Sequence, residues 1–176
     1  MKKSGYLVKK RKVIFSKGPI HLVDCDIVMP GGKKISRQVL EHPGAVVLIP
    51  MIERSRILLV RQFRFAVRQS LWELPAGGIE KGEALKNSAR RELAEETGFW
   101  PKKLTRLFSF YPTPGISSEV MHLFLAEALV PRKARGDDDE RIEVREFSLA
   151  QIGRMVHRGQ IRDGKTLLGY YSLRQG

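Results

Sequence analysis

The chain has 176 residues, of which 42% are hydrophobic, so it can form one catalytic domain with a small subdomain but not two large independent domains. Its formal net charge of +13 indicates an attraction for anions, yet it does not decide between RNA and a small phosphorylated substrate. A single cysteine, Cys25, excludes an intrachain disulfide, and the alternating residues around it predict a small buried side chain.

Neither a secretory signal nor a membrane span is indicated. Residues 1–12 are basic and lack the apolar run of a signal peptide. The longest apolar stretch, residues 45–52, contains Pro50 and is too short to cross a bilayer. We therefore expect a cytoplasmic protein that does not use a membrane as a partner.

Short strands separated by turns make up the first part of the chain. The expected strands are residues 12–15, 21–29 and 34–40, and the Pro30-Gly31-Gly32-Lys33 turn joins the last two. This pattern predicts a small β subdomain over residues 1–42, followed by a catalytic domain over residues 43–176.

Stronger apolar runs follow from Ala45 and predict the strands of a buried sheet. These expected strands are residues 45–48, 57–60, 71–74, 104–110, 120–126 and 142–147. The cluster Pro75-Ala76-Gly77-Gly78 interrupts them as a chain breaker. Strands and helices in this mixed order indicate an α+β or α/β sandwich and not a helical bundle.

Three helices are expected in the same region. Apolar residues four apart predict the first helix over residues 83–97, which Gly98 ends. Ser148 and Gln151 have the spacing of a capping box and open a helix over residues 149–157. The last helix is expected to begin near Asp163 and to continue to residue 173.

Three glutamates stand at the end of the first helix. Residues three and four apart share a helix face, so Glu92 projects beside both Glu95 and Glu96. Like charges at this spacing repel by roughly 0.2–0.5 kcal/mol per pair, and Arg91 offsets only part of this. A hard divalent cation such as Mg²⁺ would offset more, because it binds carboxylate oxygens. A solvated helix face is the alternative for these glutamates taken alone.

The residues around these glutamates resemble the Nudix box. Counted from Gly77, the pattern continues with Glu83 six residues on, Arg91-Glu92 fourteen and fifteen on, and then Leu93, Glu95-Glu96, Gly98 and Phe99. Residues 60–64, 71–77 and 111–115 resemble the corresponding segments of ADP-ribose pyrophosphatases. Pro114 stands some sixteen residues past Gly98, where a proline is typical of the ADP-ribose subfamily that the chain resembles. The resemblance covers roughly residues 40–147.

This resemblance implies an α+β fold, an α/β/α sandwich built around a mixed sheet, and Mg²⁺-dependent hydrolysis of ADP-ribose to AMP and ribose 5-phosphate. Mn²⁺ is the expected substitute ion. The implied metal ligands are Glu92, Glu96 and the main-chain carbonyl of Ala76. Glu95 and Glu83 would bridge metals or orient metal-bound water, and Arg91 would position the cluster by ion pairing.

The family often takes its general base from a mobile acidic loop outside the box. Glu140 is the first candidate here and Asp138 the second, because the register of an unaligned loop is not fixed. A solvated loop that balances nearby arginines is the alternative for this acidic run.

Substrate contacts are expected from arginines, because a guanidinium fork suits phosphate and ribose oxygens. We nominate Arg37, Arg61 and Arg64 for these contacts, and Glu73 to accept from a ribose hydroxyl. Each arginine taken alone fits a surface charge equally well. By analogy with the family we also expect a homodimer, in which the amino-terminal strands reach across to the partner's site.

Three other functions compete with this one. The same chemistry could act on a sugar nucleotide such as GDP-mannose or ADP-glucose. The positive charge could serve an RNA-binding or RNA-decapping protein, although the sequence holds no aromatic-rich binding motif and its basic residues are dispersed, which disfavours a nucleic-acid partner. A catalytically inactive scaffold is the third alternative, and the intact set of box residues speaks against it.

Overall fold

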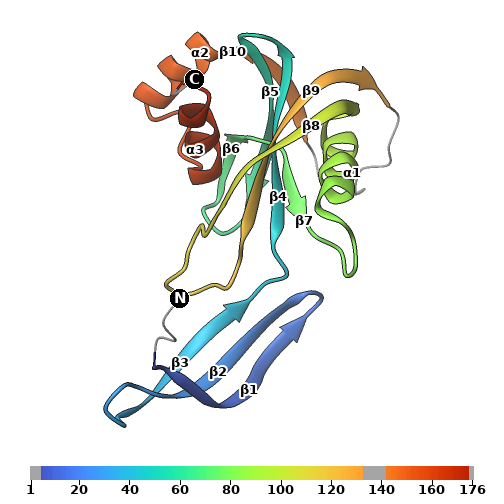
Figure 1. The fold of residues 1–176 in the computed structure, drawn as a ribbon. Helices are drawn as coiled ribbons and strands as arrows, with labels where there is room; N and C mark the ends of the chain where they lie inside the picture. The colour runs from blue at the N-terminus through green and yellow to red at the C-terminus, as the bar shows by residue number, and fades with distance from the viewer. Residues whose placement is uncertain (1–4, 133–141, 175–176) are drawn as a thin grey trace. The chain divides into compact units, whose positions relative to one another are not determined.

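The computed structural model describes residues 5–132 and 142–174 (Figure 1). The chain divides into two compact units. Unit 1 comprises Met1–Gly44 and Tyr111–Val120, and unit 2 comprises Ala45–Phe110 and Met121–Gly176. Across the described residues, no helix has the length and apolar character that a bilayer crossing requires.

Unit 1 contains a three-stranded antiparallel sheet in the order β1-β2-β3. Its strands are β1 (Leu7–Lys17), β2 (Ile20–Val28) and β3 (Lys34–Glu41). The first strand is longer than the expected residues 12–15, because its lysine-rich start pairs with the end of β2 although it lacks an apolar alternation. Cys25 is 8% exposed, which confirms its expected burial.

Unit 2 is built on a seven-stranded mixed sheet in the order β10-β5-β4-β9-β8, with β6 paired to β5 and β7 paired to β4. The strands are β4 (Ala45–Glu53), β5 (Arg56–Arg64), β6 (Gln69–Glu73), β7 (Ala76–Gly78), β8 (Phe99–Phe110), β9 (Met121–Pro131) and β10 (Glu143–Ser148). Strands β4 and β9 run parallel, and the other pairs are antiparallel.

Both faces of this sheet are covered by helices. Successive β4 residues point to opposite faces. Val46 and Leu48 lie in one buried cluster with residues of α1 (Leu85–Thr97), and Val47 and Ile49 lie in another with residues of α2 (Leu149–His157) and α3 (Gly164–Ser172). Figure 1 shows α1 on one side of the sheet and α2 and α3 on the other. This confirms the α/β/α sandwich with a mixed sheet.

The ends of the helices follow the local sequence signals. Gly98 has φ 73° and ends α1 in the left-handed conformation. Ser148 and Gln151 form both hydrogen bonds of a capping box at the start of α2. Asp163 caps α3 by accepting from the backbone N–H of Thr166. The expected boundaries of α2 are confirmed, whereas α1 begins two residues later than residue 83.

The strands around Pro101 and around the glycine segment also differ from the sequence-based expectation. Strand β8 begins at Phe99 and not at Leu104, because Pro101 is tolerated at the edge of a sheet, where its missing N–H breaks no inner ladder. The breaker cluster contains the short strand β7, in which Ala76 pairs with Val47 and Gly78 with Ala45. This pairing fixes the glycine segment against the centre of the sheet.

Candidate active site

The acidic face of α1 lies against the glycine segment of β7. An ideal Cβ at Gly77 would stand 2.0 Å from a Glu92 carboxylate oxygen, so only glycine admits this carboxylate so close to the main chain. One turn further along α1, Glu96 accepts a hydrogen bond of 3.1 Å from the backbone N–H of Ala76. Two carboxylates therefore flank the main chain at residues 76 and 77.

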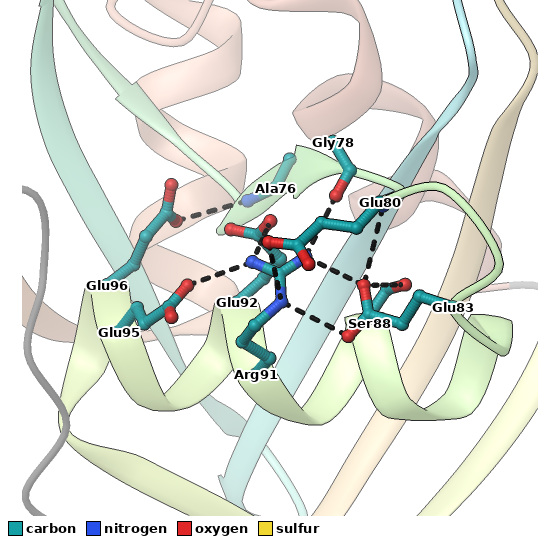
Figure 2. Close-up of polar contacts among 9 residues, drawn as sticks. All are labelled: Ala76, Gly78, Glu80, Glu83, Ser88, Arg91, Glu92, Glu95 and Glu96. Carbon is teal, nitrogen blue, oxygen red and sulfur yellow. Dashed lines mark hydrogen bonds and ion pairs between the residues drawn. The ribbon is translucent and has the colours of Figure 1, made fainter.

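Arg91 is the centre of this cluster (Figure 2). Its Nη1 atom lies 2.7 Å from a Glu92 oxygen and 3.0 Å from a Glu95 oxygen. Its Nη2 atom lies 2.9 Å from a Glu83 oxygen and donates to the carbonyl oxygen of Gly78 at 3.0 Å. One guanidinium group thus contacts three carboxylates of the box and its glycine loop.

The carboxylates of the cluster differ in their electrostatic environment. The hydrogen bond from Arg91 lowers the pKa of Glu83 below its ordinary value, with a further contribution from the Ser88 hydroxyl, which donates to Glu83 at 2.7 Å. Burial raises the pKa of Glu92 above its ordinary value, although the Arg91 charge opposes the shift. The folded chain therefore favours the charged form of Glu83 and disfavours that of Glu92, which a further cation would stabilise.

The donor set fits a hard divalent cation. Carboxylate oxygens and a main-chain carbonyl are the ligands that Mg²⁺ prefers. As their side chains are placed here, no three His, Cys, Asp or Glu residues of the described ranges could share one ion. Glu92, Glu96 and the main-chain carbonyl of Ala76 are the groups that could hold a metal, with waters and substrate oxygens completing its shell.

A cavity of about 380 Å³ opens beside the cluster. Its lining residues are Glu83, Asn87, Arg91, Ala94, Glu95, Trp100 and Arg132. The guanidinium carbon of Arg132 lies 3.6 Å from the centroid of the Trp100 ring, which is a close cation–π contact. Glu83 and Glu95 of the box thus face a space that also presents a cation.

Glu73 lies in a second, buried cluster. The residue is 1% exposed, and its carboxylate accepts from Arg64 Nε at 2.9 Å and from Arg64 Nη2 at 2.8 Å. Lys165 of α3 also donates to it, and the Lys165 Nζ atom lies 3.1 Å from Asp163. Burial acts to raise the pKa of Glu73, but Arg64 and Lys165 outweigh it and the pKa is lowered.

The nominated substrate residues belong to both units of the chain. Arg64 and Glu73 bind each other, and Arg61 is an exposed residue of β5 with Glu143 at 3.6 Å. Arg37 and Pro114 are exposed residues of unit 1, and Arg37 donates to the carbonyl of Ser36. Glu140 and Asp138 lie outside the described residues. The contacts of these residues with a substrate stay predictions.

Lys165 is a residue that the sequence did not single out. A lysine in the first turn of a short helix carries no motif, and its partner Glu73 stands 92 residues earlier. The tight approach of Glu92 to Gly77 was also not expected, although the glycine itself was part of the recognised pattern. Ser88 is buried and lies four residues before Glu92 on the same helix face. This spacing is the one local signal that could have indicated its hydrogen bond to Glu83.

Comparisons with known proteins identify relatives of this chain. A model of the NUDIX domain family matches residues 41–168. The ADP-ribose pyrophosphatase of Bacillus subtilis (strain 168) is 40% identical over 158 residues, which cover 89% of this chain and 85% of that protein. A GDP-mannose pyrophosphatase of Escherichia coli O1:K1 / APEC is 32% identical over 180 residues, covering 92% of this chain and 91% of that protein.

A solved structure described as an ADP compounds hydrolase shares the fold, with a TM-score of 0.84 at 20% sequence identity, over 97% of this chain and 92% of that one. The family model spans most of the chain, and its range includes the glycine segment, Arg91 and the glutamates of α1. The expected fold class and the expected resemblance are both confirmed. This chain belongs to the Nudix family.

Proposed function

We propose that this protein is a Mg²⁺-dependent pyrophosphohydrolase that cleaves the diphosphate bridge of ADP-ribose and releases AMP and ribose 5-phosphate. The observation that carries the proposal is the contact of the Glu92 carboxylate with Gly77, beside the Glu96 bond to Ala76. It gathers oxygen donors of the kind that bind a divalent cation. The 40% identity to an ADP-ribose pyrophosphatase supports this substrate.

The chain's own residues would bind and orient the reactants. A divalent cation held by Glu92, Glu96 and the Ala76 carbonyl would neutralise diphosphate oxygens and make a water molecule more acidic. Arg91 keeps Glu83, Glu92 and Glu95 in one arrangement, so these side chains need not be ordered during the reaction. Glu95 lines the adjoining cavity and would orient the attacking water.

The general base is proposed from outside the box. Glu140 is the first candidate and Asp138 the second, and either carboxylate would take the proton from the attacking water. Separate Glu140→Gln and Asp138→Asn variants assign the role. The variant that lacks the general base should have a kcat lower than that of wild type by about 10²-fold or more. Arg61 and Arg64 are proposed to meet the phosphate and ribose oxygens, with Arg37 and Pro114 as further contacts.

A sugar nucleotide is the second candidate substrate, because a GDP-mannose pyrophosphatase is 32% identical over nearly the full chain. Initial rates for ADP-ribose, GDP-mannose, ADP-glucose, NADH and a dNTP, with Mg²⁺, with Mn²⁺ and with EDTA, separate the two. We expect ADP-ribose to have the highest kcat/KM and EDTA to abolish turnover. A higher kcat/KM for GDP-mannose would replace ADP-ribose as the substrate.

RNA retention, measured on the same protein sample, distinguishes an RNA-binding role from the hydrolase. Retention of RNA that weakens steeply with salt, without turnover of any small diphosphate, would contradict the hydrolase and favour the polyanion partner. Turnover of ADP-ribose at physiological ionic strength would leave RNA binding without a catalytic role.

A cytoplasmic location stays a prediction of the sequence.

A homodimer is proposed from the surface of unit 1. Strand β1 exposes Leu7, Val8, Val13, Ile14 and Phe15 at 43–59% each, more apolar surface than a lone strand usually leaves in water. A second copy of the chain would cover it. Light scattering after size exclusion should give twice the chain mass of 20.0 kDa, and a Val13→Lys/Phe15→Lys variant should shift toward one chain mass. A wild type of one chain mass would contradict the dimer.

A further inference from the structure

A second cavity lies between α2 and α3, on the face of the sheet opposite to α1. Its volume is about 650 Å³, and its lining residues are Leu149, Ala150, Gly153, Arg154, His157, Arg158, Tyr170 and Arg174. The two clusters of buried residues place α2 and α3 against one side of β4 and α1 against the other. This cavity is therefore separated from the acidic cluster by the thickness of the sheet.

The lining is strongly basic. Arg154, Arg158 and Arg174 contribute three guanidinium groups, His157 adds an imidazole, and the lining contains no Asp or Glu. Within the described ranges, the guanidinium groups of Arg154 and Arg158 have neither an ion pair nor a hydrogen bond, and both side chains are exposed. Grouped cations without a carboxylate repel one another, and a bound anion would relieve that repulsion.

A buried tyrosine is among the residues that line the cavity. The Tyr170 residue is 5% exposed, and its hydroxyl oxygen accepts from Arg174 Nη1 at 3.0 Å. An ideal Cβ at Gly153 would stand 2.6 Å from that hydroxyl, so a glycine is needed in α2 for the tyrosine to reach this position. The hydroxyl still carries a proton that it can donate to a bound oxygen.

We propose that this cavity binds the phosphate group of a small phosphorylated molecule, at a site that takes no part in the proposed hydrolysis. Guanidinium groups match the oxygens of a phosphate and bind them through two parallel hydrogen bonds. The volume falls in the range of about 300–1,000 Å³ that small-molecule pockets occupy. A concave site of this size suits a compact anion, whereas RNA binding would use an extended basic stripe.

Amide NMR titration of the full chain in EDTA tests the proposal, because without a metal the acidic cluster has no reason to bind phosphate. The probes are inorganic phosphate and pyrophosphate at constant ionic strength, with chloride as the blank. We expect saturable shifts at Gly153 and His157 and none at Gly77 and Gly78. The shifts should be absent for the chloride blank.

A charge-matched pair of variants sharpens the result. Arg154→Gln/Arg158→Gln removes two cations of the cavity, and Arg54→Gln/Lys102→Gln removes two exposed cations elsewhere in unit 2. We expect the first to weaken phosphate binding by about tenfold or more, as the loss of charge-assisted hydrogen bonds predicts, and the second to leave it unchanged.

Three results would overturn the proposal. The first is the absence of saturable shifts at the cavity. The second is an equal loss of affinity in both double variants, which would show that net charge alone attracts the anion. The third is binding of an RNA oligonucleotide that depends on Arg154 and Arg158 while phosphate does not bind. None of these outcomes bears on ADP-ribose turnover, which is measured separately with Mg²⁺.

Discussion

The ammonium group of Lys165 is ion-paired with the carboxylate of Glu73 in the interior of unit 2, across 92 residues of sequence. The two side chains are 7% and 2% exposed. The neighbouring Thr166 hydroxyl accepts from the backbone N–H of Leu74 at 2.8 Å. Helix α3 thus holds the chain where β6 ends, directly before the segment that brings Ala76 and Gly77 to the acidic helix.

Replacement of Lys165 should destabilise the fold strongly. Lys165→Met leaves the buried Glu73 carboxylate with Arg64 as its remaining cation, so the loss should approach but not exceed the about 3–5 kcal/mol that an uncompensated buried charge costs. Urea denaturation should show this loss, with Lys102→Met, an exposed lysine of β8, as the control. If Lys165→Met does not fold, Lys165→Arg should still fold. Equal stability of Lys165→Met and wild type would refute the pairing.

Stability should depend on pH through Glu73. Its pKa is lowered in the folded chain, since Arg64 and Lys165 outweigh the effect of burial. As pH falls, the unfolded chain therefore takes up a proton at Glu73 before the folded chain does. The contribution of Glu73 to the free energy of unfolding is complete above the ordinary glutamate pKa of about 4.3 and is lost as pH falls below it.

The variant Glu73→Gln removes this dependence. Its free energy of unfolding should fall less steeply than that of wild type between about pH 5 and about pH 3, because no proton uptake at residue 73 remains. Denaturation curves over that range measure both slopes. Glu53→Gln, at an exposed position of β4, is the control. Identical slopes for Glu73→Gln and wild type would argue against the shifted carboxyl.

Two neighbouring glycines offer a matched test of the proposed metal site. A Cβ at Gly77 would meet the Glu92 carboxylate at 2.0 Å, whereas a Cβ at Gly78 meets nothing within 4 Å. Gly77→Ala should displace Glu92 and weaken Mg²⁺ binding by about 10–100-fold, the scale found when groups that orient metal ligands change. Calorimetry with a nonhydrolysable ADP-ribose mimic measures this, and similar affinities in both alanine variants would exclude the site.

Removing the charge of one glutamate in the site and of one on the surface distinguishes a catalytic role from a general effect of charge. Glu96→Gln should lower kcat by about 10²-fold or more, because the amide oxygen is a poorer metal ligand than a carboxylate. Glu53→Gln makes the same chemical change at an exposed position of β4, so its turnover should be close to wild type. Steady-state kinetics with saturating Mg²⁺ compares them, and an unchanged kcat for Glu96→Gln would remove that residue from the mechanism.

Features that depend on a few neighbouring residues were predictable from the sequence. The capping box at Ser148, the left-handed Gly98 and the cap at Asp163 all follow from side chains within three or four positions. The arrangement of Arg91 with Glu92 and Glu95 follows from helical spacing in the same way. The mixed order of strands and helices, together with the resemblance to the Nudix box, predicted the fold class, and that resemblance predicted the location of the candidate site.

Features that depend on distant partners were not predictable. Arg64 and Glu73 were each nominated for a substrate contact, and their bond to one another arises only when β5 and β6 pair. Lys165 is buried because it pairs with the distant Glu73 carboxylate, so the residues around Lys165 give no sign of its burial. Strand β8 begins before the expected Leu104, and the edge position that admits Pro101 to it is a property of the finished topology.

The parallel pairing of β4 with β9 also sets the order in which the protein can form. Ala45 pairs with Met121 and Pro50 with Ala126, so the centre of the sheet joins segments on either side of the box helix. Contacts over such long sequence separation carry a large loop-closure entropy and slow the search for the native state. Until β9 has left the ribosome, β4 keeps an open edge although its first six residues are buried in the folded chain, and such an unpaired apolar edge favours aggregation of the nascent chain.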